Sequence, residues 1–252
     1  MWKLFRNVYL YIVLNGMEVR MLVEFKDVVK TYGTGDGMQK AADHINFSID
    51  EGEFVVILGQ SGAGKSTVLN MLGGMDVPDE GKVMVTEREV SAMNDRELGE
   101  YRADVIGFVF QFYNLIPSLT AYENIAIIKS IVKNAEDADK LLELVGLSHC
   151  RDKFPSQMSG GEQQRVSIAR ALAKNPKILL GDEPTGALDS ETGVIVLELL
   201  QKLCREDGKT VILVTHNSDI AKCADKVIRM KNGKIREVVA NDNPLSVKEV
   251  EW

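Results

Sequence analysis

A glycine-rich segment in the first third of the chain has the composition of a phosphate-binding loop. Glycines let backbone N–H groups curl around phosphate oxygens, a lysine adds positive charge at the terminal phosphates, and a serine hydroxyl suits Mg²⁺. The apolar run 54–58 precedes the segment and a helical pattern follows it, so the loop would open a helix whose N-terminus favours anions. A purely structural turn is the alternative, but this context favours a phosphate site. The segment fits the pattern G-x-x-x-x-G-K-[ST] with Gly59, Gln60, Ser61, Gly62, Ala63, Gly64, Lys65 and Ser66, followed by Thr67.

Two adjacent carboxylates follow a second apolar run. The segment 178–180 predicts a buried strand, and Asp182 and Glu183 come directly after it. Asp182 would lie beside the phosphate loop, where it could hold Mg²⁺ together with Ser66. Glu183 could polarise an attacking water, as a general base does. Many strands end in a solvated acidic turn, but together with the phosphate loop the pair predicts a nucleotide hydrolase.

An octet between these two motifs defines the class. Residues 158–165 read Met-Ser-Gly-Gly-Glu-Gln-Gln-Arg, which resembles the signature motif of ABC ATPases. The order of this octet relative to the loop and the carboxylates also matches that family. The chain is therefore similar to ABC transporter ATP-binding subunits over most of its length, and the resemblance implies ATP and Mg²⁺ as cofactors.

The resemblance implies roles for residues that have no clear signal alone. A single tyrosine usually packs, a single histidine at a strand end is usually solvated, and a glutamine can cap a loop. Their shared family order favours function. The implied roles are adenine stacking for Tyr32, γ-phosphate sensing and metal binding for Gln111, and a γ-phosphate switch for His216. Asp189 would lie in a loop that contacts a second copy. The signature residues that would contact the nucleotide of that copy in trans are Ser159, Gly160, Gly161 and Glu162.

The octet departs from the family pattern at two positions. Met158 replaces the usual leucine, a change that conserves volume. Glu162 replaces the usual glutamine and brings a carboxylate near an anionic ligand. We expect this change to be tolerated, because the serine and the glycines make the phosphate contacts and the Glu162 side chain can point away.

These residues require an α/β fold, a P-loop NTPase (RecA-like) core with an N-terminal antiparallel β subdomain and an inserted α-helical subdomain. Residues 21–58 are β-rich, with alternation over 22–28 and 45–49 and a continuous apolar run over 54–58, and Asn232-Gly233 predicts a hairpin turn. Between about 112 and 165 the pattern is mostly helical, beginning with a capping box of Thr120 and Glu123 and continuing through apolar residues as far as Ile131. We expect one ATPase domain over 21–240 and a loose polar tail over 241–252.

The composition excludes several classes. A net charge of −7 argues against a nucleic-acid-binding surface, and the cysteines, Cys150, Cys204 and Cys223, show no metal-ligand spacing in sequence. No apolar run is long enough for a membrane helix. Residues 1–20 are a leader or a mis-called start: a secretory signal, a membrane-touching helix, or an untranslated stretch before Met17 or Met21. The last reading is favoured, because a strand pattern starts immediately afterwards.

Several local strings resemble the macrolide-export, lipoprotein-release and cell-division branch of the ABC family. Residues 182–189, Asp-Glu-Pro-Thr-Gly-Ala-Leu-Asp, are one of them. The resemblance implies a homodimer joined through ATP, acting at the cytoplasmic face of the membrane with a separate permease in export or mechanotransmission. A regulatory cell-division or cell-envelope complex that moves no cargo is the alternative.

Overall fold

Two β-sheets and the helices packed on them form the structure, a computed structural model that describes residues 20–34 and 37–250. Residues 1–19 of the predicted leader lie outside the described residues. The strands are β1 (Met21–Tyr32), β2 (Gln39–Asp50), β3 (Phe54–Leu58), β4 (Glu80–Val85), β5 (Arg88–Glu89), β6 (Ile106–Phe110), β7 (Ile178–Asp182), β8 (Thr210–Thr215), β9 (Lys226–Lys231) and β10 (Lys234–Ala240).

Helices alternate with strands along much of the chain. The α-helices are α2 (Lys65–Leu72), α3 (Asp95–Asp104), α4 (Ala121–Ala126), α5 (Ala138–Leu144), α6 (Gly160–Leu172) and α7 (Ser190–Arg205). The short 3₁₀ helices are η2 (Val90–Ala92), η3 (Ile127–Ser130), η4 (Ser148–Cys150), η5 (Pro155–Gln157), η6 (Ile220–Cys223) and η7 (Val247–Glu249).

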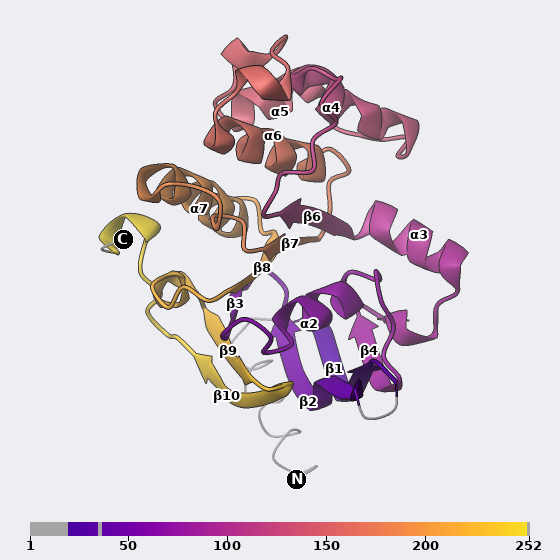
Figure 1. The fold of residues 1–252 in the computed structure, drawn as a ribbon. Coiled ribbons are helices and arrows are strands. Elements are labelled where there is room, and N and C mark those ends of the chain that lie inside the picture. The colour runs from indigo at the N-terminus through magenta and orange to yellow at the C-terminus, as the bar shows by residue number, and fades with distance from the viewer. Residues whose placement is uncertain (1–19, 35–36, 251–252) are drawn as a thin grey trace.

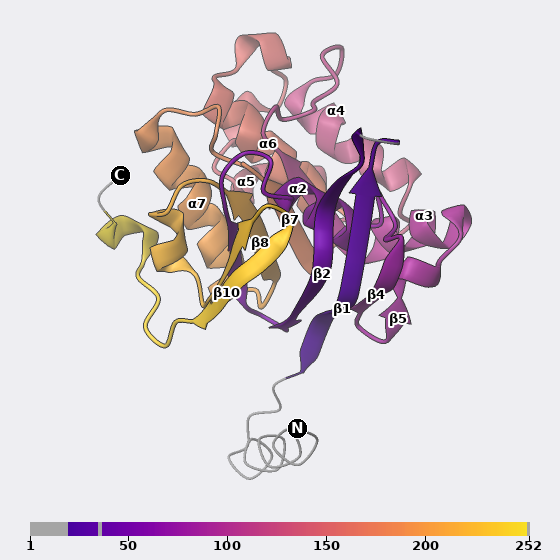
Figure 2. The ribbon, with the colours of Figure 1, turned by 60° about the horizontal axis from the view of Figure 1, so that its bottom comes forward.

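The two sheets differ in strand direction. The N-terminal sheet is antiparallel, in the order β2-β1-β4-β5, and Figure 2 shows its long strands β1 and β2 side by side. The other sheet has the order β10-β9-β3-β8-β7-β6 and is parallel except for β10. Helices α4, α5 and α6 lie between β6 and β7 in the chain and form a lobe at the top of Figure 1. The predicted fold class is confirmed.

The parallel sheet is buried on both faces, and strand β3 shows why its sequence is apolar throughout. Side chains alternate along a strand, so successive residues enter different cores. Val55 and Ile57 pack with the antiparallel sheet and α2, whereas Phe54 and Val56 pack with the helical lobe and α7. Because β3 and β7 both run parallel to β8, which lies between them, their carboxyl ends lie at the same edge of the sheet. That edge carries the phosphate loop and the carboxylate pair.

The predicted hairpin between β9 and β10 is confirmed, and its turn supports the phosphate loop. Asn232 and Gly233 both have positive φ, 51° and 74°, as the tightest hairpin turns require. A Cβ at Gly233 would lie 2.6 Å from the Lys40 carbonyl oxygen, so only glycine fits. The Gly233 N–H donates to the carbonyl of Ala63 at 3.0 Å.

The helix after the capping box is shorter than its apolar spacing predicts. Thr120 and Glu123 do form the capping box, but the α-helix ends at Ala126 and continues as η3. Ile128 still packs against the core, but Ile127 and Ile131 are exposed, so little burial stabilises a longer helix, and adjacent β-branched isoleucines disfavour it locally. Helix α3, which was not predicted, is capped by Asn94 and has few apolar residues.

The expectation of a loose tail beyond Ala240 is wrong for residues 241–250. Val247 and Val250 are 1% and 6% exposed and join the core beneath α7. Gln201 fixes the segment from α7, because its Nε2 donates to the Leu245 carbonyl at 2.9 Å and its Oε1 accepts from the Val247 N–H at 3.1 Å. The segment was expected to be loose because most of its residues are polar, but the two valines, three residues apart, are enough to anchor it.

This packing predicts a measurable contribution to stability. Val247→Ala should lower the free energy of unfolding by about 1–2 kcal/mol, because buried methyl groups are lost and a cavity remains. Val238→Ala, at a position that is 45% exposed on β10, is the matched control and should change it by less than about 0.5 kcal/mol. Equal effects of the two variants in urea unfolding would show that the segment is not anchored.

Among residues 20–34 and 37–250, no helix is both long enough and apolar enough to cross a bilayer.

Candidate active site

The phosphate loop joins β3 to α2 and lines an open cavity of about 580 Å³, a size usual for small-molecule sites. Gly64 precedes the helix with φ 97°, and a Cβ there would lie 2.1 Å from the Ala41 carbonyl oxygen. The Lys65 ammonium is buried and donates to the carbonyls of Gly59 and Gln60 at 2.8 and 3.1 Å. The predicted residues that line the cavity are Tyr32, Ser61, Gly62, Ala63, Gly64, Lys65, Ser66, Thr67, Gln111, Asp182, Glu183 and His216.

The two carboxylates lie beside the loop and have different surroundings. Asp182, the last residue of β7, accepts a hydrogen bond from the Ser66 hydroxyl at 3.3 Å. Burial raises the pKa of Asp182, and the neighbouring Glu183 carboxylate adds to that rise. A divalent cation would offset both effects, and the serine and aspartate oxygens are the hard ligands that Mg²⁺ prefers. These residues therefore fit the predicted metal site.

Glu183 is held from both of its oxygens. Thr215 donates its hydroxyl to Oε2 at 3.2 Å, and Nδ1 of His216 lies 3.0 Å from Oε1. The Lys65 ammonium is 4.0 Å from the same Oε1. Glu183 has φ 47°, a conformation that non-glycine residues rarely adopt and that directs this side chain from the strand end. The role of Thr215 was not predicted, although it directly precedes His216 at the end of β8.

Tyr32, at the end of β1, also lines the cavity. Its hydroxyl donates to Asp76 Oδ2 at 2.5 Å, and the Lys30 ammonium pairs with Oδ1 of the same aspartate at 2.8 Å. These contacts fix the edge of the ring while leaving it 43% exposed. An exposed, anchored ring suits stacking on a base, and the adenine-stacking role of Tyr32 stays a prediction. The contacts of Tyr32 with Asp76 and Lys30 were not predicted.

The predicted signature residues lie on another surface. Ser159 caps α6, and residues 159–162 and Asp189 are absent from the described lining of the cavity. A Cβ at Gly161 would lie 1.9 Å from Cγ2 of Thr192, whose N–H donates to Asp189 at 2.9 Å. The starts of α6 and α7 are therefore in contact and form one surface. Ser159 is exposed and Gly160 is partly exposed, so a second molecule could contact them, whereas Gly161 is buried against Thr192.

Gln164, the seventh residue of the signature octet, connects α6 to both loops of the cavity, a contact that the sequence did not predict. Its Nε2 donates to the Phe110 carbonyl at 3.2 Å and to the Pro184 carbonyl at 2.7 Å. Those carbonyls flank Gln111 and Glu183 in the chain. The side chain is fully buried, so the signature helix and the two loops are joined through one amide.

Comparison with known protein families matches ABC transporter over residues 42–186. The chain belongs to this family and is an ATP-binding cassette, an ABC ATPase domain. It is 45% identical over 223 residues to the uncharacterized ABC transporter ATP-binding protein MJ0796 of Methanocaldococcus jannaschii, over 85% of this chain and 95% of that protein. The structure of that cassette, a post-hydrolysis dimer bound to ADP and Pi, superposes with a TM-score of 0.80 at 44% identity, over 87% of this chain and 98% of that one.

Two longer relatives also match. The ABC transporter ATP-binding protein MG065 homolog of Mycoplasma pneumoniae is 43% identical over 234 residues, which are 92% of this chain but only 50% of the relative. The macrolide export ATP-binding/permease protein MacB of Chlorobaculum tepidum is 45% identical over 219 residues, 85% of this chain and 33% of that protein. The chain therefore spans half or less of these relatives, and the similarity to MacB agrees with the predicted branch.

Proposed function

We propose that two copies of this chain bind ATP and Mg²⁺ between them and hydrolyse the ATP to drive a separate membrane permease in export or mechanotransmission. The observation that carries the proposal is the oriented Glu183 carboxylate, held by Thr215 and His216 in the same cavity as Lys65 and Asp182. A carboxylate fixed beside a phosphate loop is what general-base attack by water requires.

The proposed chemistry assigns one task to each group. Lys65 and the N-terminus of α2 bind the terminal phosphates, and Tyr32 stacks on the base. Ser66 and Asp182, with Gln111, would hold Mg²⁺, which neutralises phosphate charge when it is bound. Glu183 accepts the proton of the attacking water, and His216 orients that carboxylate and contacts the γ-phosphate.

A second copy completes the site in this proposal. Ser159 and Gly160 lie beside the loop of Asp189, away from the cavity of their own chain, whereas Gly161 is buried against Thr192. The dimeric state of the MJ0796 cassette supports a similar pairing here. ATP would then join two copies and hydrolysis would release them, as a ligand that favours one of two states does.

In this proposal the chain lies at the cytoplasmic face of the membrane and contacts the permease. An exposed apolar residue beside Gln111 supports that contact. Phe112 is 74% exposed, whereas Leu115 packs against the core of the helical lobe. Phe112 therefore suits contact with a short cytoplasmic helix of a permease, and Leu115 does not.

Placing a charge at Phe112 tests this contact. Phe112→Asp should leave ATP hydrolysis by the isolated chain within about twofold, because an exposed substitution costs little stability. The same variant should lose the permease that copurifies with the wild-type chain from detergent-solubilised membranes and that mass spectrometry identifies. Val239→Asp, on the exposed face of β10, is the matched control and should retain it. Equal retention by both variants would place the permease contact elsewhere.

A further inference from the structure

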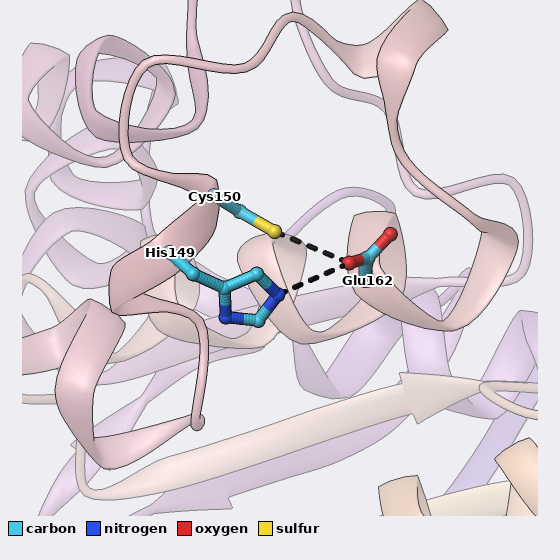
Figure 3. A group of neighbouring side chains, drawn as sticks. All are labelled: His149, Cys150 and Glu162. Atoms are coloured by element: carbon cyan, nitrogen blue, oxygen red, sulfur yellow. Dashed lines mark hydrogen bonds and ion pairs between the residues drawn. The ribbon is translucent and has the colours of Figure 1, made fainter.

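Glu162, which replaces the glutamine expected from the resemblance, belongs to a cluster of three metal-ligating side chains. Figure 3 shows the His149 imidazole and the Cys150 thiol of η4 directed at its carboxylate. Cys150 Sγ lies 3.2 Å and His149 Nε2 3.4 Å from Oε1, and all three ligand atoms lie within 4.8 Å of one another. The fold thus creates a ligand set that cysteine spacing in the sequence did not predict.

We propose that His149, Cys150 and Glu162 form a binding site for Zn²⁺ or a similar borderline divalent cation. The inference does not depend on the nucleotide chemistry proposed above. A thiolate and an imidazole select such ions over Mg²⁺ or Ca²⁺. Three protein ligands leave a fourth tetrahedral position for water.

Two of the three separations between ligand atoms are close to those of tetrahedral coordination, and the third, from His149 Nε2 to Cys150 Sγ, is at most 4.8 Å. Zinc binds sulfur at about 2.3 Å and nitrogen or oxygen at about 2.0–2.1 Å, so ligand atoms of one site lie about 3.3–3.6 Å apart. The observed sulfur–oxygen and nitrogen–oxygen distances, 3.2 and 3.4 Å, need little adjustment. Small side-chain rotations would then admit the ion.

The two oxygens of Glu162 have separate partners, so the ion need not disturb the helix cap. Oε2 accepts the Ser159 backbone N–H at 2.7 Å, whereas Oε1 faces His149 and Cys150. The Ser159 hydrogen bond lowers the pKa of Glu162 to about 2, so this ligand is already anionic. An ion on Oε1 would tie η4 to the turn that carries the signature residues.

Charge and protons balance for a dication. On binding, the Cys150 Sγ–H bond breaks, the proton passes to solvent, and sulfur donates an electron pair to the ion. Neutral His149 donates the lone pair of Nε2. One thiolate and one carboxylate neutralise the two positive charges. Burial raises the pKa of the Cys150 thiol, so the ion must displace this proton.

Lys153 competes with the ion. Its ammonium lies 3.8 Å from the same Oε1 and would be repelled by a bound dication. The side chain is partly exposed, so it can move into solvent. The ion would reach the buried thiol from the side of His149, whose side chain is 63% exposed.

Titration of the tag-free chain with Co²⁺, without nucleotide, tests the proposal. We expect one Co²⁺ per chain, with a thiolate charge-transfer band and the intense visible bands of four-coordinate cobalt. Zn²⁺ should displace it and Mg²⁺ should not. Cys150→Ser should abolish the charge-transfer band, and His149→Ala should weaken affinity at least about tenfold. Lys153→Gln should tighten binding.

Cys223→Ser is the matched control, because this cysteine is also buried but is not in the cluster, and it should change nothing. Absence of a charge-transfer band in the wild type, or its retention in Cys150→Ser, would overturn the proposal. If Cys150→Ser does not fold, His149→Ala decides the outcome, since an exposed histidine can be removed safely. Affinity within twofold of wild type in that variant would contradict the site.

Discussion

Glu183→Gln should lower the rate of ATP hydrolysis by about 10²–10⁴-fold while ATP binding stays close to that of the wild type. A positioned general base contributes about this factor, and an amide cannot accept the proton of the attacking water. The substitution keeps the shape of the side chain, so Thr215 and His216 retain a neighbour of similar size. Single-turnover hydrolysis and nucleotide binding, measured separately, test the two halves of this prediction.

Glu87→Gln provides the matched control for the change of a carboxylate to an amide. Glu87 is exposed, and the ion pair that it makes with Arg20 is also exposed. We expect wild-type hydrolysis in this control. If Glu183→Gln turned over ATP at the parental rate, Glu183 would not be the base, and the bonds to Thr215 and His216 would have only a structural role.

Lys65→Ala should weaken ATP binding by about 10- to 100-fold and abolish hydrolysis at ordinary ATP concentrations. Hydrogen bonds to charged groups contribute about 1.5–3 kcal/mol each, and 1.4 kcal/mol is a tenfold change in affinity. Lys65 is buried between the loop and Glu183, and loop carbonyls hold its ammonium. Equilibrium binding of a fluorescent ATP analogue measures the loss.

Two measurements distinguish loss of the Lys65 ammonium from misfolding as the cause of weaker ATP binding in Lys65→Ala. Lys133→Ala removes an exposed lysine of the helical lobe and should bind ATP normally. Thermal unfolding of Lys65→Ala without nucleotide should remain a single cooperative transition, with a midpoint a few degrees below that of the wild type because the hydrogen bonds to the Gly59 and Gln60 carbonyls are lost. Unchanged ATP affinity in Lys65→Ala would mean that the cavity does not bind the phosphates as proposed.

The fold was largely predictable because its decisive segments carry strong local signals. Continuous apolar runs such as β3 and β8 can only be buried strands, and Asn232-Gly233 permits few conformations other than a tight turn. The end of α4 and the anchored segment after Ala240 were not predictable in this way. Both depend on which apolar side chains find a partner surface, and that is decided by tertiary packing.

In the candidate site, too, the motif residues were predictable and the contacts that depend on tertiary packing were not. Motif residues such as Lys65 and Glu183 were located from chain order and family pattern, and the structure brings them into one cavity. The contacts of Gln164 and Asp76 were not predicted, because a place in a motif does not show which carbonyl or hydroxyl group a side chain reaches in the fold. The cluster of His149, Cys150 and Glu162 also depends on the fold, since it joins η4 to the first turn of α6.

The molar mass of the Glu183→Gln variant in solution, measured by light scattering with and without Mg-ATP, tests the central claim most directly. A site completed in trans requires two chains, and a variant that cannot hydrolyse ATP should hold them together. We expect 27.9 kDa without nucleotide and about twice that mass at saturating ATP. A mass that stays at 27.9 kDa while ATP is bound would contradict the shared site.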